Sequence, residues 1–221
     1  MVEINRAEVH AALAEPRRLA IVDALALEDL SPGELCERTG QPSNLLAHHL
    51  GVLATAGIVG RRRSDADGRR SYLTLAWDNP VVAATALAGP APEGRRVVFV
   101  CSANSARSQF AASLMACHEV AQVTSAGTSP AAEIHPLAIA QLAAHGLTPL
   151  SPTPRSAGEI LRPEDIVVAV CDNAFEGLGR DRVNLHWSIP DPATGSADDF
   201  RHAFDELTPR IGRLAEALTH G

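Results

Sequence analysis

The chain contains no lysine, and all 19 of its basic residues are arginine. We interpret this as the codon bias of a GC-rich genome and not as a functional signal. The chain also has no uninterrupted apolar run of about 18 residues, the length that a membrane-spanning helix requires. Its first residues, MVEINRAEVH, carry charges where a signal peptide has an apolar core. These absences predict a soluble, cytoplasmic protein with no membrane partner.

Cysteine is scarce as well, and the four cysteines, Cys36, Cys101, Cys117 and Cys171, are widely scattered. Such spacing is not that of a disulfide framework, and thiols in a cytoplasmic protein stay reduced. We expect Cys36 and Cys117 to be core residues on helices. At least one of the other two thiols is then available for chemistry.

The net charge of −7 argues against a chain that binds nucleic acid over its whole surface, but it leaves room for a local basic patch. Five arginines lie close together and bracket the turn-like segment 64–68. They are Arg61, Arg62, Arg63, Arg69 and Arg70. This pattern predicts a basic hairpin whose arginines contact phosphate groups.

Two prolines and two glycines in the segment 89–94 interrupt the apolar periodicity just before a strand-like run begins. The residues before this segment are typical of helices with one hairpin, whereas those after it alternate strand-like and helical stretches. We therefore predict two domains, residues 1–88 and 96–221, joined by a linker at 89–95.

The first half carries the signals of two short helices that meet at a tight turn. Glu15-Pro16 starts an earlier helix, Ser31-Pro32-Gly33-Glu34 caps the next one, and Gly40 ends it before a further helix that runs to Gly57. Together with the hairpin, these helices predict an α+β winged helix-turn-helix domain. In that geometry the N-terminal residues of the second helix face base edges in the major groove. The exposed candidates are Gln41, Ser43, Asn44 and His48.

The stretch from EPRRL at 15–19 to SYLTL at 71–75 resembles the ArsR family of small winged-helix repressors. The matching motifs include LAHHL on the recognition helix, AGIV after it and GRRSYLTL on the wing. The resemblance implies operator DNA as a partner and a homodimer that presents two recognition helices to two half-sites. Many members sense thiophilic metals through paired cysteines, but that position reads Leu30-Ser31-Pro32 here. Because Cys36 alone does not make a soft-metal site, we expect no metal here and place any sensor in the second domain.

Four strand-like runs in the second half, at 97–101, 122–126, 166–170 and 183–187, alternate with helical stretches. This alternation is the pattern of parallel βαβ units. It predicts an α/β domain with a four-stranded, parallel, doubly wound sheet of the flavodoxin-like type.

The first of these strand-like runs ends in a loop that leads into a helical stretch at 109–120. The loop reads Cys101-Ser102-Ala103-Asn104-Ser105-Ala106-Arg107-Ser108. Successive backbone N–H groups in such a loop converge on an anion, and the helix N-terminus adds a partial positive charge that also favours a cysteine thiolate. Arg107 adds a planar, bidentate donor for phosphate or arsenate oxygens. Asn104 is placed to brace the loop, and the hydroxyl of Ser108 to hydrogen-bond the thiolate of Cys101.

A reaction at such a loop also needs an acid that protonates the leaving oxygen. Asp191, which Pro192 follows, comes after the last predicted strand. Because loops at the carboxyl ends of parallel strands line the same crevice, this side chain is expected near Cys101. The sequence therefore predicts Asp191 as the general acid.

Residues 96–218 resemble the low-molecular-weight tyrosine phosphatases and the thioredoxin-type arsenate reductases. The matching segments are VVFVCSANSARSQFAASLM at 97–115 and TSAGTSPAAEIHPLAIAQLAAHGL at 124–147. The segment HWSIPDPATGSADDFRHAFDEL at 186–207 is closer to the reductases, and Gln109 and Ala193 favour the same branch. The resemblance implies that Cys101 attacks arsenate, that Arg107 and the loop amides hold the adduct, and that Asp191 protonates the departing oxygen.

The reductases pass the oxidation on through two further cysteines, and this relay is incomplete here. Cys171 matches the first and is a candidate resolving thiol, but no cysteine stands at 175–179, and the loop position that often holds another is Ala106. Three outcomes stay open. In the first, an external thiol or thiol–disulfide reductant (mycothiol with mycoredoxin, glutaredoxin or thioredoxin) completes the reaction. In the second, Cys171 resolves Cys101 directly, and in the third, the domain only senses an oxyanion or redox change.

The leading hypothesis is a dimeric transcriptional regulator fused to an arsenate reductase that acts in the response to arsenic. A protein tyrosine phosphatase is the second hypothesis, which steady turnover of aryl phosphates would support. The third is a non-catalytic transcription factor whose second domain only binds its ligand. Release of operator DNA by arsenate in a Cys101→Ser variant would support that hypothesis.

Overall fold

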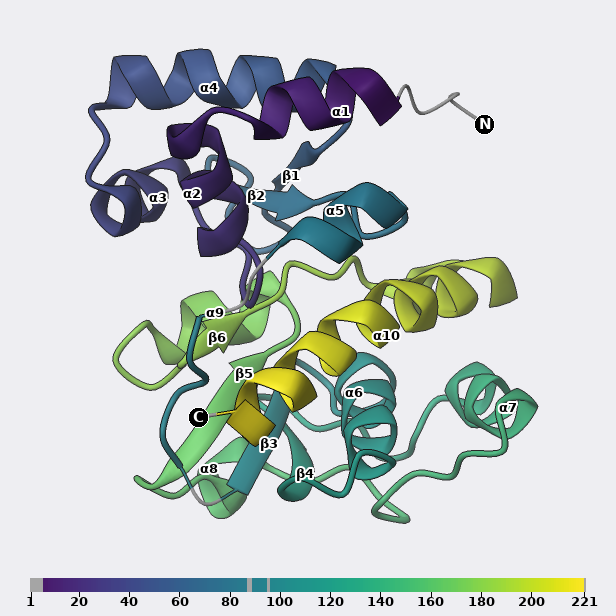
Figure 1. Cartoon of the computed structure of the whole chain (residues 1–221). Coiled ribbons are helices and arrows are strands. Elements are labelled where there is room, and N and C mark those ends of the chain that lie inside the picture. Colours follow the sequence, from purple (N-terminus) through teal and green to yellow (C-terminus); the bar gives the residue numbers. More distant parts are fainter. Residues whose placement is uncertain (1–5, 87–88, 95, 221) are drawn as a thin grey trace. The chain divides into compact units, whose positions relative to one another are not determined.

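The computed structural model describes residues 6–86, 89–94 and 96–220 of the chain (Figure 1). The chain separates into two compact units, Met1–Gly89 and Pro90–Gly221. Within the described residues, no helix combines the length and the apolar character that crossing a bilayer demands.

The first unit combines helices with one antiparallel hairpin. In chain order its described elements are α1 (Arg6–Leu13), α2 (Pro16–Ala24), α3 (Pro32–Thr39), α4 (Ser43–Thr55), β1 (Val59–Arg63), β2 (Ser71–Leu75) and α5 (Pro80–Thr85). The two strands pair in the register that places Val59 opposite Leu75 and Arg63 opposite Ser71. The winged helix-turn-helix architecture that the sequence predicts is confirmed.

Local signals in the sequence fix the turn between α3 and α4. The side chain of Ser31 accepts a hydrogen bond from the N–H of Glu34, and the Glu34 carboxylate accepts one from the N–H of Ser31, so α3 begins with a capping box. Gly40 ends α3 with a φ of 65°, a left-handed conformation that glycine adopts without strain. Leu35 and Leu53 are fully buried in one core, which joins the two helices.

The second unit alternates strands and helices. Its described elements are β3 (Arg96–Cys101), α6 (Arg107–Ala116), β4 (Gln122–Gly127), α7 (Pro136–Ala144), α8 (Ala157–Ile160), β5 (Asp165–Ala169), α9 (Asp172–Leu178), β6 (Leu185–His186), the 3₁₀ helix η1 (Pro192–Thr194) and α10 (Ala197–His220).

A four-stranded parallel sheet with the strand order β4-β3-β5-β6 forms the centre of this unit. Residues 97–100 of the inner strand β3 are completely buried, as expected for a parallel strand that is covered on both faces. Val100 pairs with Ala126 on one side and with Ala169 on the other, so three strands end at the same level. The predicted parallel, doubly wound sheet is confirmed, and its carboxyl edge carries the Cys101 loop.

Three expectations from the sequence are wrong in detail. The last strand is Leu185–His186 and thus shorter than 183–187, and beside it the Asn184 side chain accepts the N–H of Val167 at 2.7 Å. The helix after the loop begins at Arg107 and ends at Ala116 instead of spanning 109–120, and the backbone soon turns left-handed at Glu119. Cys117 is exposed and not in the core, since this helix stops just before it.

Candidate functional sites

The loop 101–108 runs from the end of β3 to the start of α6 and lies against the end of β4. A Cβ atom on Gly127 would come within 2.6 Å of the Ser102 carbonyl oxygen and 2.9 Å of the Asn104 nitrogen. Glycine at this position therefore allows the backbone at the end of β4 to pack directly against the backbone of the loop.

The carbonyl groups of the loop point toward the segment 128–135. Those of Cys101, Ser102, Ala103 and Ser105 accept hydrogen bonds of 2.8–3.0 Å from the N–H groups of Thr128, Ser129, Ala131 and His135. Because the N–H of a trans peptide points opposite to its C=O, the N–H groups of the residues that follow each carbonyl face the other way. The amides of 102, 103, 104 and 106 therefore share one side of the loop.

The sulfur of Cys101 lies on this amide side of the loop. The N–H of Asn104 donates to the Cys101 Sγ at 3.2 Å, and Asn104 adopts a left-handed backbone with a φ of 52°. The N-cap of α6 is Ala106, which has no side-chain acceptor for the first N–H groups of the helix. Converging amides and an open helix N-terminus together make a cradle for a tetrahedral oxyanion.

A chain of hydrogen bonds leads from Arg155 through Asn104 and Ser108 to Cys101. The Asn104 Oδ1 accepts the backbone N–H of Arg155 at 2.8 Å, so its Nδ2 faces Ser108 and donates to the Ser108 Oγ at 2.8 Å. The Ser108 Oγ lies 3.1 Å from the Cys101 Sγ. This oxygen accepts from Asn104, which leaves its own O–H available to the sulfur, and a Cys101 thiolate, which can only accept, requires that direction.

Arg107 and Asp191 are brought together at the mouth of the loop. The Arg107 Nη2 lies 2.8 Å from the Asp191 Oδ2, and its Nη1 donates to the carbonyl oxygen of Ile189 at 3.0 Å. The Arg107 side chain is 3% exposed, whereas that of Asp191 is 46% exposed. The guanidinium is thus held rigidly, and the carboxyl group stands beside it within reach of solvent.

Cys171 is the second thiol at the same edge of the sheet. It follows β5, and the N–H of Val170 donates to the carbonyl of Val100 at 2.8 Å, so the ends of β5 and β3 run side by side. The Cys171 Sγ lies 3.6 Å from the Ser102 Oγ. Burial raises the pKa of the Cys171 thiol, and the nearby Arg107 guanidinium only partly offsets this shift. Cys171 is therefore a neutral thiol at neutral pH.

Three further residues help to hold this site in place, but the sequence alone did not identify them. Gly127 had the clearest signal, because a glycine at a strand end often marks a close backbone approach. Arg155 contacts Asn104 across 51 positions of the chain, and Ile189 contributes only its carbonyl oxygen. Among the described residues, no group of three His, Cys, Asp or Glu side chains is placed to hold a metal ion.

The exposed start of α4 carries three of the four predicted DNA-facing residues. Ser43, Asn44 and His48 are exposed there. The prediction that Gln41 is exposed to DNA is wrong. Gln41 is 7% exposed, and its Nε2 donates to the carbonyl oxygen of Arg17 at 3.1 Å. Its side chain joins α2 to the turn before α4, and this internal partner, invisible in the local sequence, removes it from the surface.

The hairpin displays the predicted arginines. Arg61 and Arg63 alternate with Arg62 along β1, and both are exposed while Arg62 is half-buried. Arg69 and Arg70 are exposed in the turn that leads to β2, where the carbonyl of Arg70 accepts the N–H of Ser64 at 3.1 Å. The hairpin is therefore a positively charged projection of the first unit.

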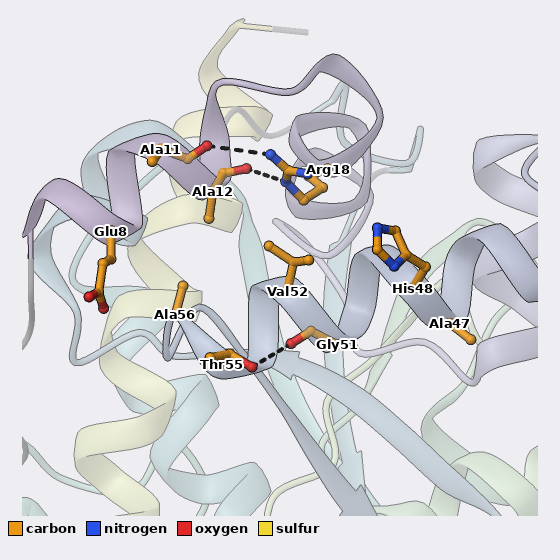
Figure 2. A pocket seen from close by; sticks show the side chains of 10 residues that line it. All are labelled: Glu8, Ala11, Ala12, Arg18, Ala47, His48, Gly51, Val52, Thr55 and Ala56. Carbon is orange, nitrogen blue, oxygen red and sulfur yellow. Dashed lines mark hydrogen bonds between the residues drawn. The ribbon is translucent and has the colours of Figure 1, made fainter.

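A groove of about 680 Å³ lies beside α4, and Figure 2 shows the residues that line it. Its walls are formed mostly by small side chains, such as Ala12 on α1 and Gly51 on α4, and Val52 lies among them. Arg18 closes one side by donating to carbonyl oxygens at the end of α1, and His48 lies on the wall formed by α4. The groove and the exposed helix start thus share one residue.

Comparison with known proteins assigns the first unit. A family profile described as a helix-turn-helix domain matches residues 13–62. The nodulation protein NolR of Rhizobium meliloti is 36% identical over 67 residues, which are 30% of this chain and 52% of NolR. An uncharacterized HTH-type transcriptional regulator of Mycobacterium tuberculosis is 39% identical over 72 residues, which are 32% of this chain and 60% of the regulator. The chain thus spans only 52–60% of the length of these curated relatives.

Solved structures resemble the second unit. An arginine phosphatase, YwlE, from Geobacillus stearothermophilus is 26% identical with a TM-score of 0.52, and the match covers 57% of this chain and 94% of YwlE. An arsenate reductase from Archaeoglobus fulgidus is 28% identical with a TM-score of 0.50, and the match covers 54% of this chain and 98% of the reductase.

The profile of the family "Low molecular weight phosphotyrosine protein phosphatase" matches residues 96–221, which is more than half of the chain. This match includes the Cys101 loop, Cys171 and Asp191. The chain therefore belongs to the low molecular weight phosphotyrosine protein phosphatase family, and it carries a helix-turn-helix domain of the ArsR type ahead of that family's domain.

Proposed function

We propose that this protein is a DNA-binding transcriptional regulator whose second domain reduces arsenate, and that it acts in the response to arsenic. The observation that carries the reductase proposal is the pair of thiols at one edge of the sheet. Cys101 lies in the anion cradle, and the Cys171 sulfur is 3.6 Å from the hydroxyl of the adjacent Ser102. Phosphoryl transfer needs one nucleophile, whereas reduction of arsenate needs two electrons, which two thiols supply.

The first step forms a bond between the Cys101 sulfur and arsenic. The thiolate attacks arsenate, and an arsenic–oxygen bond breaks. The loop amides and Arg107 stabilise the charge on the remaining oxygens. Asp191 in its acid form gives its proton to the departing oxygen, which leaves as water, and the contact of 2.8 Å between the Asp191 Oδ2 and the Arg107 Nη2 keeps this carboxyl group beside the reacting oxygens.

The second step breaks the sulfur–arsenic bond. The Cys171 thiol loses its proton to solvent, and its sulfur attacks the Cys101 sulfur. A Cys101–Cys171 disulfide forms, and the electron pair of the sulfur–arsenic bond passes to arsenic, which leaves as arsenite. The two thiols are oxidised by two electrons and arsenic is reduced by two. An external thiol or thiol–disulfide reductant, such as mycothiol with mycoredoxin, glutaredoxin or thioredoxin, then restores both thiols.

The DNA-binding part of the proposal rests on the first unit. The exposed Ser43, Asn44 and His48 at the start of α4 suit a major groove, and the arginines of the hairpin suit the phosphates beside it. A helix-turn-helix module of this type reads two half-sites as a symmetric pair, so we propose a homodimer on operator DNA. The relative from Mycobacterium tuberculosis is named as a transcriptional regulator.

Arsenite production by the purified full chain tests the reductase proposal. Thioredoxin, glutaredoxin and mycothiol systems are supplied in parallel, with Cys101→Ser as the blank. We expect turnover with one of these donors, no turnover in Cys101→Ser and a large loss in Cys171→Ser. Cys117→Ser is the matched control, because Cys117 is an exposed thiol outside the loop. Full activity of Cys171→Ser would instead assign the second step to an external thiol.

Phosphatase activity is the second candidate, and the family match and the arginine phosphatase neighbour favour it. The same cradle would hold a phosphoryl group, and Cys101 would form a thiophosphate that water hydrolyses. Phosphotyrosine and phosphoarginine peptides are the substrates to test. Turnover of either peptide, without arsenite production under any donor and with no loss in Cys171→Ser, would replace the reductase proposal. Retained phosphate binding without any turnover would indicate that the second domain is an oxyanion sensor.

A further inference from the structure

The hydrogen bond from Ser108 to Cys101 depends on the orientation of one amide. The oxygen and nitrogen of an asparagine amide have nearly the same size, so their partners decide which atom faces which side. At Asn104 the deciding partner is the backbone N–H of Arg155, which can only donate and therefore requires the amide oxygen. If Asn104 turned over, its oxygen would attract the Ser108 proton away from Cys101.

The N–H of Arg155 is itself held in place from two directions. The carbonyl oxygen of Arg155 accepts the N–H of Gly127 at 2.8 Å. Its Nη2 donates to the hydroxyl of Thr124 and lies 3.4 Å from the carbonyl oxygen of Ser125. Thr124, Ser125 and Gly127 all belong to β4. The main chain and the side chain of Arg155 are thus both hydrogen-bonded to β4.

The neighbour of Arg155 in the chain cannot replace its backbone donor, and the acceptors of its guanidinium are buried. The residue before Arg155 is Pro154, which has no N–H. Thr124 is 7% exposed and Ser125 is completely buried, so both acceptors of the guanidinium are shielded from water. A charge-assisted hydrogen bond in such a place is stronger than one at the surface.

We propose that Arg155 is a positioning residue: by anchoring its backbone to β4, it fixes the Asn104 amide and directs the Ser108 proton toward the Cys101 sulfur. The inference rests on the proposed function only in that Cys101 is the nucleophile. It assigns Arg155 no contact with substrate, since its side chain bonds to β4.

The reactivity of Cys101 toward iodoacetamide tests this role in the full chain. At about pH 6, where a thiol without hydrogen-bond donors is almost fully protonated, the alkylation rate follows the thiolate fraction. We expect Arg155→Met to slow alkylation of the Cys101 peptide, followed by mass spectrometry, about tenfold. Arg155→Lys should recover most of the rate, because an ammonium group can still donate to Thr124.

Two further variants separate positioning from general loosening. Arg96 also bridges strands of this sheet, by hydrogen bonds of 2.8–2.9 Å to Asp165, but it lies at the opposite end of β3. Arg96→Met should lower the melting temperature and leave the alkylation rate unchanged. Thr124→Val removes the hydroxyl that receives the guanidinium with little change of shape, and it should slow alkylation about threefold. If Arg155→Met does not fold, Thr124→Val tests the positioning role of Arg155 in its place.

Folded Arg155→Met that reacts at the wild-type rate would overturn the inference, and so would Arg96→Met that slows equally. If Arg155→Met does not fold, wild-type reactivity of Thr124→Val would overturn it. Alkylation needs no turnover, so the result is independent of the arsenate assay. A chain that produces no arsenite but shows these rate changes would refute the reductase proposal and support the role of Arg155.

Discussion

The two candidate sites hold their functional groups in opposite ways. In the Cys101 site, Arg107 is 3% exposed and Asn104 and Ser108 are completely buried, and each has internal hydrogen-bond partners. On the first unit, Arg61, Arg63 and Asn44 are exposed. Buried, interlocked groups act as a unit, so single changes there should be severe and not additive. Exposed charges should act separately, in small steps that depend on salt.

The largest effect should follow from Arg107→Lys. A lysine cannot bridge the Ile189 carbonyl and the Asp191 carboxylate while it also holds two oxygens of a ligand. We expect kcat/KM for arsenate, or for an aryl phosphate if that is the substrate, to fall by about two to three orders of magnitude. Arg201→Lys, at an exposed ion pair on α10, is the matched control. Near-normal kinetics in Arg107→Lys would contradict the assignment of the bidentate role.

The next effect concerns the hairpin. Arg61→Ala combined with Arg63→Ala should weaken binding to a duplex of mixed sequence about tenfold or more, and it should reduce the slope of log affinity against log salt by about two. Arg6→Ala, an exposed arginine on α1, serves as the control. Unchanged affinity in the double variant would show that the hairpin is not part of a DNA interface.

A smaller, isosteric change tests the interlocked site. In Asn104→Asp, the carboxylate can accept from Arg155 and Ser108 but can donate to neither, so the Ser108 proton turns away from Cys101. We expect alkylation of Cys101 to slow about tenfold at about pH 6 with iodoacetamide. Asn44→Asp, the same change at an exposed position, should leave this rate unaltered. Equal rates in Asn104→Asp and wild type would refute the proton direction at Cys101.

The pH dependence of disulfide closure should show the smallest effect. Burial raises the pKa of Cys171, so its folded-state thiol keeps its proton at pH values where an unfolded cysteine has lost it. Closure of the Cys101–Cys171 bond needs the Cys171 thiolate, and its rate in single-turnover experiments should still rise several-fold above about pH 8.5. A rate that levels off near neutral pH would show that burial does not suppress the ionisation of the Cys171 thiol.

The sequence could predict the fold because its signals are local. Capping at Ser31, the glycine at 40 and the buried runs around Val100 each act within a few residues, and the structure agrees with them. The sequence also placed Cys101 and Arg107 in a strand-to-helix loop, since that motif occupies eight consecutive positions.

What the sequence could not predict depends on partners that are distant in the chain. Gln41 has the residue type of a DNA contact, but Arg17 binds its side chain. Cys117 is apolar enough for a core, but its helix ends one residue earlier. Arg155 reads as an ordinary surface arginine, and only the fold brings its N–H to Asn104.

The most direct test of the central claim is a single turnover of the reduced full chain with arsenate and no external reductant. We expect about one arsenite per chain, together with a Cys101–Cys171 disulfide that mass spectrometry detects after trapping. Cys117→Ser should give the same yield and Cys171→Ser should give none. Absence of arsenite and of the disulfide in the wild-type chain would contradict the claim that these two thiols reduce arsenate.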